Sequence, residues 1–413
     1  MFITAANLKK SFFKIAFIFI VSFNFAYATN LYYSGVCFVG NASEFDVLFP
    51  YSKTIDDKTE GALDKFVYPR ILEATKDSSN FDLKTSDLAD LSGANAYVLA
   101  FAIDGENLSI SESELEKGNL FDLRAELSAQ ILVFDYKTRN IVFNYPVVAQ
   151  YTSATRGEPP SKEFISNMFE TMLLDADSKV NIFNLLIGKL DKIELNNDQI
   201  FRVGVGDVIL SESSFKRFPE DIKKSPGILK RQLGQSLVAA LASNCEINVL
   251  PFIGNTSALT QESDEITNTN AAIGGKMLTR FSNGDIFELI VPEADYSVNL
   301  TLRGFSHKLG KATNVQQLVV YGSYINLELS QPFSGQVYCN QNFKNVYVDS
   351  VIKGSPSSIS RDWFCFNTAT SVLFDGLTKH LSSPDKDWAK KFGGEGAFKQ
   401  MKSASKIIKK CKL

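Results

Sequence analysis

The sequence has 413 residues, of which 45% are hydrophobic and 22% are charged, and its formal net charge is −3. These proportions are typical of folded proteins and exclude a mainly disordered or low-complexity chain. The length predicts two or three domains, and the slightly acidic balance argues against nucleic-acid binding, because the bulk of the protein has no general attraction for phosphate backbones.

Residues 1–28 have the layout of a secretory signal peptide. Three lysines precede an apolar run, and the small-x-small triplet Ala26-Tyr-Ala28 follows it. A membrane-spanning helix needs roughly 20 apolar residues, and this run is shorter. We therefore predict cleavage after Ala28, no transmembrane span after cleavage, and a periplasmic or secreted mature protein.

The first half of the mature chain predicts strands and helices in alternation. A buried strand at Leu31–Val39 is followed by a helix that begins near Gly61 and by a central strand at 93–103. Next come the two strands of a hairpin, Leu123–Phe134 and Ile141–Tyr151, joined by a turn at 136–140, and a closing helix at Lys162–Leu174.

The second half predicts the same order of elements. A strand at 200–210 precedes a helix that begins near Gly227 and carries leucines at every fourth position, from Leu229 to Leu241. The further expected elements are a central strand at 269–278, a hairpin of Tyr296–Phe305 and Leu318–Leu329 with a turn at 308–311, and a helix at Arg361–Leu381.

This repeated order indicates a duplication. Matched elements are offset by about 166 residues at the first helix and by about 200 at the last, so insertions are expected in the second half, at Asn255–Thr269 and Phe333–Ser360. We predict an α/β (α+β) fold with two tandem domains, each a mixed sheet with flanking helices, at 29–198 and 199–392, followed by a basic tail at 393–413. The alternative is a single α+β protein whose similar strands are unrelated.

Five cysteines remain in the mature chain. In an oxidising compartment two of them are expected to pair, and Cys339 with Cys365 is the preferred disulfide because both fall in the second half. The alternative for Cys37 and Cys245 is that they are small buried hydrophobic residues. No CxxC motif occurs and the two histidines, His307 and His380, lie far apart, so neither a metal site nor a cofactor is predicted.

No set of catalytic residues emerges from the sequence. A Gly-x-Ser-x-Gly nucleophile elbow is absent, and the glycines of Gly204-Val-Gly206 lie in an apolar strand without the rest of a phosphate-binding loop. Carboxylates are too numerous for their spacing to identify a glycosidase pair. We predict that the protein is not an enzyme, with a secreted hydrolase of cell-wall polymer or glycan as the alternative.

The tail is strongly basic. From Lys386 onward nine lysines face two acids. A short amphipathic helix could present its apolar residues and lysines to an anionic surface or to a partner; its residues would be Lys402, Lys406, Ile407, Ile408, Lys409 and Lys410. The alternative is a solvated tail that is flexible after Gly393-Gly394.

A bacterial envelope family has a comparable pattern. The start Gly93-Ala-Asn-Ala-Tyr-Val98 and the hairpin Ala129-Gln-Ile-Leu-Val-Phe-Asp-Tyr-Lys-Thr-Arg-Asn-Ile-Val-Phe143 resemble the domain shared by the amino-terminal part of TolB, the curli-secretion lipoprotein and the lipoproteins that activate penicillin-binding proteins. In that family an Asp ends the first hairpin strand and a Gly completes the turn, whereas Asn140 stands at the glycine position here. A lipobox and propeller repeats are missing. The resemblance implies a non-catalytic docking or assembly module.

We therefore expect an exported envelope protein that binds an envelope or outer-membrane-associated protein complex. Exposed sheet edges or the two inserted loops are the expected contact surfaces. A small-ligand site in a groove between the two domains is a third possibility.

Overall fold

The structure is a computed structural model of the chain, and it describes residues 29–58, 61–76, 81–85, 96–115, 118–195, 201–254, 275–353 and 358–413. The predicted signal peptide and the predicted insertion at 255–269 lie outside these residues. Within them, the protein is a mixed α+β fold with two sheets and flanking helices, which confirms the predicted fold class.

The first half contributes five strands. They are β1 (Thr29–Val39), β2 (Phe81–Thr85), β3 (Tyr97–Leu115), β4 (Gly118–Asp135) and β5 (Ile141–Gly157). Its helical segments are η1 (Ala42–Glu44), α2 (Phe45–Leu48), α3 (Ser52–Lys58), α4 (Ala62–Thr75), α5 (Lys162–Leu174), α6 (Ile182–Ile187) and η3 (Leu190–Lys192).

The second half contributes the remaining elements. Its strands are β6 (Val203–Leu210), β7 (Gly275–Phe281), β8 (Ile286–Val291), β9 (Tyr296–Ala312), β10 (Gln316–Gln331) and β11 (Gln336–Ile352). Its helices are α7 (Glu212–Phe215), α8 (Glu220–Lys224), α9 (Pro226–Cys245), α10 (Ile359–Ser382), α11 (Lys386–Gly393) and α12 (Ala397–Ile408).

The two sheets share a topology. In the first sheet β1 pairs in parallel with β3, and β3, β4 and β5 form an antiparallel meander. In the second sheet β6 pairs in parallel with β9, and β9, β10 and β11 form the matching meander. The helix before each meander, α4 or α9, packs on the same face of its sheet as the helix after it, α5 or α10.

Irregularities in strand pairing fall at matching positions in the two sheets. The register between β3 and β4 shifts at Ile103/Gly105, and the register between β9 and β10 shifts at Leu302/Gly304. A second shift, where each meander enters its last turn, lies at Val133 in β4 and at Leu329 in β10. Because such bulges fix register and strand curvature, their repetition gives a residue-by-residue match between the sheets.

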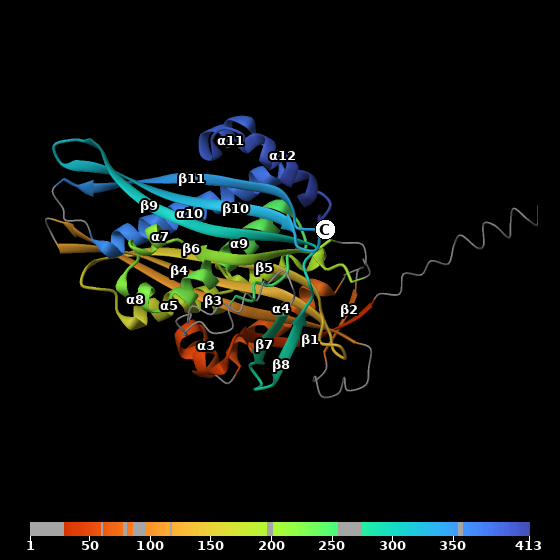
Figure 1. Cartoon of the computed structure of the whole chain (residues 1–413). Coiled ribbons are helices and arrows are strands. Elements are labelled where there is room, and N and C mark those ends of the chain that lie inside the picture. The colour runs from red at the N-terminus through yellow and green to blue at the C-terminus, as the bar shows by residue number, and fades with distance from the viewer. Residues whose placement is uncertain are drawn as a thin grey trace, which may run out of the picture.

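The layers are stacked so that α9 and α10 lie between the two sheets (Figure 1). One side of this helix pair packs on its own sheet, and the other side contacts β3 and β5 of the first sheet. Helices α4, α5 and α6 cover the opposite face of the first sheet. The second sheet therefore has one face on α9 and α10 and one face without a helical layer in the described part of the chain.

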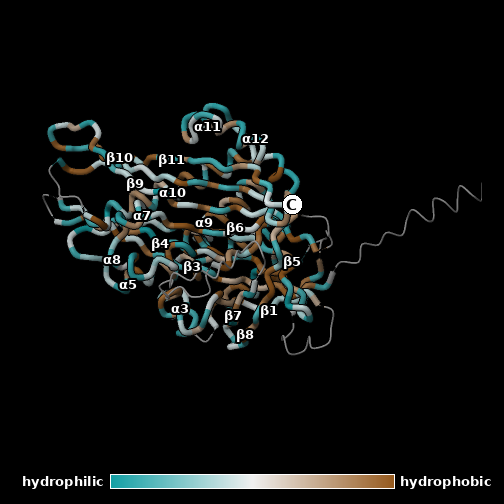
Figure 2. The backbone as a smooth tube through the Cα atoms, in the orientation of Figure 1, coloured by the Kyte–Doolittle hydropathy of each residue, from teal (hydrophilic) through white to brown (hydrophobic). Residues whose placement is uncertain are grey.

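Buried apolar residues from both halves form one continuous cluster. The predicted leucine stripe of α9 belongs to it, since Leu229, Leu233, Leu237 and Leu241 are all buried. Figure 2 shows hydrophobic stretches mainly inside the molecule and hydrophilic ones at α8 and α11. No helix in the described ranges is both long and apolar enough to span a membrane.

Several predicted elements of the second half are wrong. The segment 269–278 was expected to be the central strand of the second sheet. Its described part belongs to β7, which instead pairs with β1 of the first sheet and forms a hairpin with β8. The expected insertion at Phe333–Ser360 contains β11, the partner of β10. The turn expected at 308–311 is part of β9, and the chain turns at 313–315 instead.

The first hairpin turn also differs in detail. Arg139, and not Asn140, has the positive φ, at 63°. Its guanidinium lies 4.5 Å from the centre of the Tyr136 ring and 4.2 Å from that of Phe287. These cation–π contacts compensate for the strain of a left-handed arginine and attach the β7–β8 hairpin to the turn.

Candidate functional site

The contact between the halves contains polar residues as well as the shared apolar cluster, and arginines bridge it. Arg231 of α9 donates from Nη2 to the carbonyl oxygen of Val39 at 2.7 Å and to that of Asp104 at 2.9 Å. The Asp104 side chain lies beside it, buried at the bulge of β3. Burial raises the pKa of Asp104 to about 6, against the opposing effects of a hydrogen bond from Ser128 and the nearby Arg231 charge.

Gly105 lets α9 approach this bulge. A Cβ at Gly105 would collide with Gln235, whose side chain donates to the Asp104 carbonyl oxygen, and with Ser128. The bulge is thus occupied from outside the first sheet by a polar helix surface of the second half.

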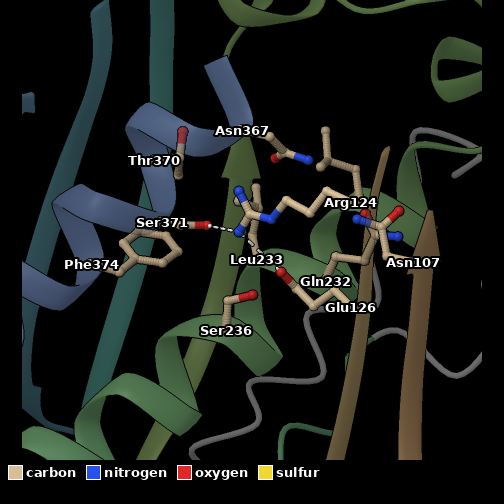
Figure 3. A pocket seen from close by; sticks show the side chains of 11 residues that line it. Asn107, Arg124, Glu126, Gln232, Leu233, Ser236, Asn367, Thr370, Ser371 and Phe374 are labelled. Atoms are coloured by element: carbon tan, nitrogen blue, oxygen red, sulfur yellow. Dashed lines mark hydrogen bonds and ion pairs between the residues drawn. The ribbon is translucent and has the colours of Figure 1, made fainter. Parts of the chain in front are cut away.

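A second arginine enters the interface from the sheet. Arg124 of β4 donates to Ser371 Oγ at 3.0 Å and pairs with Glu126 at 3.2 Å (Figure 3). It also donates to Thr368 Oγ1 at 3.3 Å, and both hydroxyl groups belong to α10. Beside it, a cleft of about 220 Å³ opens to solvent between β5, α9 and α10. Small residues of α9, such as Ser236 and Ala240, leave this space open.

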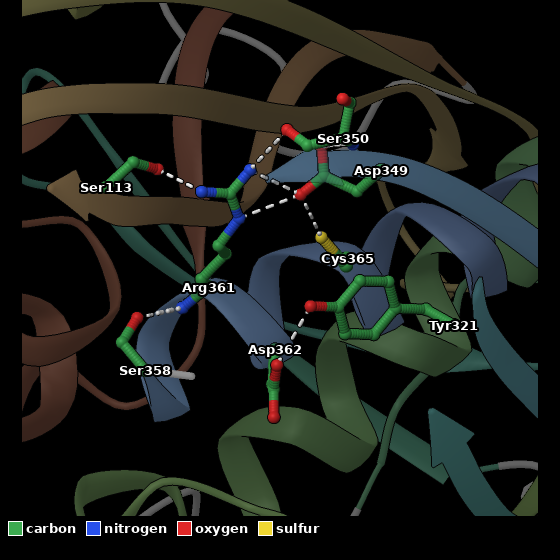
Figure 4. A network of polar contacts seen from close by, with 8 residues as sticks. All are labelled: Ser113, Tyr321, Asp349, Ser350, Ser358, Arg361, Asp362 and Cys365. Atoms are coloured by element: carbon green, nitrogen blue, oxygen red, sulfur yellow. Dashed lines mark hydrogen bonds and ion pairs between the residues drawn. The ribbon is translucent and has the colours of Figure 1, made fainter. Parts of the chain in front are cut away.

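Arg361 of α10 ties the halves together at the far end. Its guanidinium pairs with Asp349 of β11, donates to the Ser350 carbonyl oxygen at 3.2 Å, and reaches Ser113 of β3 in the first sheet (Figure 4). One side chain therefore contacts both sheets.

Asp375 is the acid among the described residues that line the cleft, and it pairs with Lys379 and accepts from Asn244 Nδ2 at 3.1 Å. Two further acids line smaller pockets nearby. Glu126 is held by Arg124 and by Gln150 Nε2 at 2.9 Å. Glu106 accepts from the Tyr51 and Ser52 backbone N–H groups at 2.9 and 2.8 Å. Burial raises the pKa of Glu106 to about 7, but its carboxylate holds the start of α3.

Another two acids, the half-buried Asp64 and the buried Asp56, also have structural partners. Asp64 Oδ1 accepts from the Val36 backbone N–H at 2.6 Å, and burial raises its pKa to about 6. Asp56 accepts from Leu63 N at 3.3 Å and from Ser282 Oγ at 2.9 Å. Both carboxylates therefore support backbone geometry near the β1 bulge.

The outer face of the second sheet is exposed at the place where the first sheet receives α9 and α10. We define the open face as the side of β9, β10 and β11 that points away from α10. Three cross-strand rows form its centre, and they are Lys308–Val320–Val348, Ser306–Gly322–Val346 and Gly304–Tyr324–Lys344. Val346 and Val348 are 53% and 51% exposed, and the neighbouring Leu318 is 37% exposed.

The first sheet has polar residues at the matching positions. Its rows are Ser109–Arg124–Thr152, Asn107–Glu126–Gln150 and Gly105–Ser128–Val148. The buried face is thus polar and the exposed face is partly apolar, the reverse of what solvent exposure alone favours. Contiguous exposed apolar residues of this kind mark interaction sites.

Farther along, the open face becomes polar. Asn326 donates to Asn340 Oδ1 at 3.0 Å and to Asn342 Oδ1 at 3.1 Å, and Asn340 donates to Glu328 at 2.9 Å. The matching end of the first sheet is apolar, as at Leu132, and packs with β7 and β8. This end of the second sheet is therefore polar where it is exposed, and the matching end of the first sheet is apolar where β7 and β8 cover it.

The basic tail is folded onto the protein. Ile407 and Ile408 of α12 are buried in the core cluster, while Lys402, Lys406, Lys409 and Lys410 are exposed. The chain ends beside α9, where Leu413 N donates to the Glu246 carbonyl oxygen at 2.9 Å. The isoleucines are therefore not available to an anionic surface or a partner, and the tail is helical rather than flexible after Gly393.

All five cysteines are buried free thiols. Cys339 lies near the start of β11, whereas Cys365 of α10 contacts Asp349, ten residues farther along that strand. That separation is about 33 Å of extended chain, and a disulfide needs Cα atoms within about 7 Å. The structure thus does not bring the expected pair together.

The two histidines have separate surroundings. His307 Nδ1 is 3.3 Å from Asp362 Oδ2, and the His380 ring lies 4.7 Å from that of Trp388. In the described ranges no cluster of three or more His, Cys, Asp or Glu residues could hold a metal ion.

Comparisons with known proteins give distant likenesses only. No family model and no curated protein matches the sequence. Among solved structures, a neuraminyllactose-binding hemagglutinin homologue from Helicobacter pylori is similar with 7% identity and a TM-score of 0.26, over 40% of this chain and 83% of that one.

Two further structures cover the same share of this chain, 40%. A hypothetical protein from Chlamydia trachomatis has 11% identity, a TM-score of 0.22 and 96% of its own length covered. A minor lipoprotein from Acinetobacter baumannii has 15% identity, a TM-score of 0.20 and 90% covered. With TM-scores this low, none of them indicates a function for this chain.

Proposed function

We propose that this chain is an exported, non-catalytic protein-binding module and that the open face of its second sheet is the docking surface. The supporting observation is the reversal between the sheets, in which exposed valines and Tyr324 occupy the positions where the first sheet seats two helices. Apolar residues at such a position gain by burial against a partner, at about 25 cal/mol per Å².

The acids described above fit this proposal better than a hydrolase. Glu126, Glu106, Asp64 and Asp56 are bound to an arginine or to backbone N–H groups, so each has a structural role.

In-cell crosslinking of the tagged mature protein tests the docking surface. We compare the wild type with the double variant Val346→Lys/Val348→Lys and with Val372→Lys, a matched control at a 52% exposed valine on α10. The expected result is a defined crosslinked complex that the double variant loses at least tenfold and the control retains, at equal melting temperatures. Equal capture by all three proteins, or no defined complex with the wild type, would contradict the proposal.

A further inference from the structure

The docking of α9 and α10 on the first sheet is the template from which we infer what can bind the open face of the second sheet. In the first sheet α9 and α10 dock over the rows that contain Arg124 and Glu126. Residue-by-residue matching places Val320 and Gly322 at these two positions in the second sheet. A curved meander with this pattern of bulges therefore accepts a pair of helices at this place.

Neighbouring side chains cover the two glycines at the centre of the open face. A Cβ at Gly322 would meet Ser306 Oγ and the Tyr324 ring, and a Cβ at Gly304 would meet Ser213 Oγ of α7. The exposed apolar part of the face is on β11, where Val346 pairs with Gly322 and Val348 lies beside it. An apolar side of a helix fits such a surface, because both parts then bury apolar area.

The charges on the sheet side are opposite to those of the template. In the first sheet the bulge residue is the acid Asp104, and the docked helix brings Arg231 to it. The matching bulge residue of the second sheet is Arg303, which is exposed. Lys308 and Lys344 flank the valines, and neither forms an ion pair with another described residue that would neutralise it. An occupant that repeats the template would bring carboxylates to these three cations.

A second copy of this chain fits poorly. In the described part of the chain its outer helical layer is that of α4 and α5, and the buried stripe Leu63/Val67 in α4 matches Leu229/Leu233 in α9. This alignment places Lys65 where α9 has Arg231. Head-to-tail stacking would therefore bring Lys65 to Arg303, and two like charges oppose that contact.

We infer that the open face binds a pair of helices from a different protein, whose contact side is apolar and is bordered by Asp or Glu residues facing Arg303, Lys308 and Lys344. This inference rests on the proposed function and names the class of partner for the same surface.

The test places a photo-crosslinking amino acid at Val346 in the full chain and maps the crosslinked peptide by mass spectrometry. Two charge variants accompany it, the reversal Arg303→Glu/Lys308→Glu/Lys344→Glu and the conservative set Arg303→Lys/Lys308→Arg/Lys344→Arg. A crosslinker at Val372 is the position control. Melting temperatures verify that all forms are folded.

The expected result is a crosslinked segment that forms an acidic amphipathic helix, with a yield that falls at least tenfold on charge reversal and is retained by the conservative set. Capture of a second copy, of phospholipid or of a segment without acids would overturn the partner class. A crosslink yield that charge reversal does not change would overturn it as well. If the captured molecule is another protein, the docking surface itself is still supported. No specific crosslink at Val346 would overturn both proposals.

Discussion

Arg231 connects the halves by hydrogen bonds to the Val39 and Asp104 carbonyl oxygens. Replacement by methionine keeps much of the volume but removes the Arg231 donor from both carbonyl oxygens and the positive charge beside the buried Asp104 carboxylate. We expect Arg231→Met to lower the free energy of unfolding by about 3–5 kcal/mol, the usual cost of removing one partner from a buried charge pair.

Urea denaturation measures this change, with Lys224→Met, an exposed position at the end of α8, as control. The control is expected to stay within about 0.5 kcal/mol of the wild type. Equal stability of Arg231→Met and the wild type would show that the arginine does not hold the interface.

The buried carboxyl group of Glu106 makes the free energy of unfolding depend on pH, and the sign of this dependence can be predicted. Burial raises the pKa of its carboxyl from 4.5 in the unfolded chain to about 7 in the folded protein. Between these values the folded state retains a proton that the unfolded state has lost, so the free energy of unfolding falls as pH rises through the window. The total effect is on the order of 3 kcal/mol.

Asp104 and Asp64, whose pKa values are raised to about 6, act in the same direction at lower pH. The interval from pH 6 to 7 therefore reports mainly on Glu106. We predict that Glu106→Gln removes the fall of stability over this interval, measured by thermal unfolding, whereas Glu170→Gln on the exposed side of α5 leaves it in place. A slope unchanged by Glu106→Gln would contradict the assignment.

At the scale of elements, α12 behaves as part of the core rather than as a docking tail. Ile408 is fully buried, whereas Lys406 is exposed on the same helix. Ile408→Ala is expected to cost about 2–4 kcal/mol and Lys406→Ala less than about 0.5 kcal/mol, by chemical denaturation. If Ile408→Ala left stability unchanged, the apolar side of the helix would be free for other contacts.

Elements with long, regular apolar patterns could be predicted from the sequence. The strand at β1 and the helices α5, α9 and α10 combine long apolar patterns with clear ends, and the predicted bounds agree with the structure to within a few residues. Strand β11 was missed because one of its faces is exposed. Only Cys339 and Phe343 mark its buried side clearly among polar residues such as Asn340 and Asn342.

Strand β7 shows a different limit. Its pattern predicts a strand, but no local signal specifies which sheet it joins. Pairing with β1 depends on the apolar patch around Cys37 and Leu132, which only the assembled first sheet presents. Of the candidate surfaces, the tail was predicted from its charge, yet the burial of Ile407 and Ile408 depends on tertiary packing.

At the scale of the whole molecule, we expect the halves to unfold as one cooperative unit. They share an apolar cluster, and Arg124, Arg231 and Arg361 cross their interface. We predict a single calorimetric unfolding transition for the mature chain, which Arg231→Met shifts as a whole. If the chain unfolded in two separate transitions and the variant shifted only one of them, the halves would not unfold as one cooperative unit.

The open face could not be recognised as a docking surface from the sequence, because that assignment depends on comparing the two folded sheets. Val346 and Val348 alternate with polar residues as in any half-exposed strand. Only the matched bulges place them at the positions where the first sheet receives α9 and α10.

The most direct test of this account is the reactivity of a single introduced thiol. The five native cysteines are buried, and burial raises their pKa values, so a small maleimide would label Val346→Cys or the control Val372→Cys selectively. We predict that Val346→Cys is labelled at least tenfold more slowly in intact cells than in the purified protein, while the two rates agree for Val372→Cys. Equal rates at Val346→Cys in cells and in solution would show that nothing covers the open face.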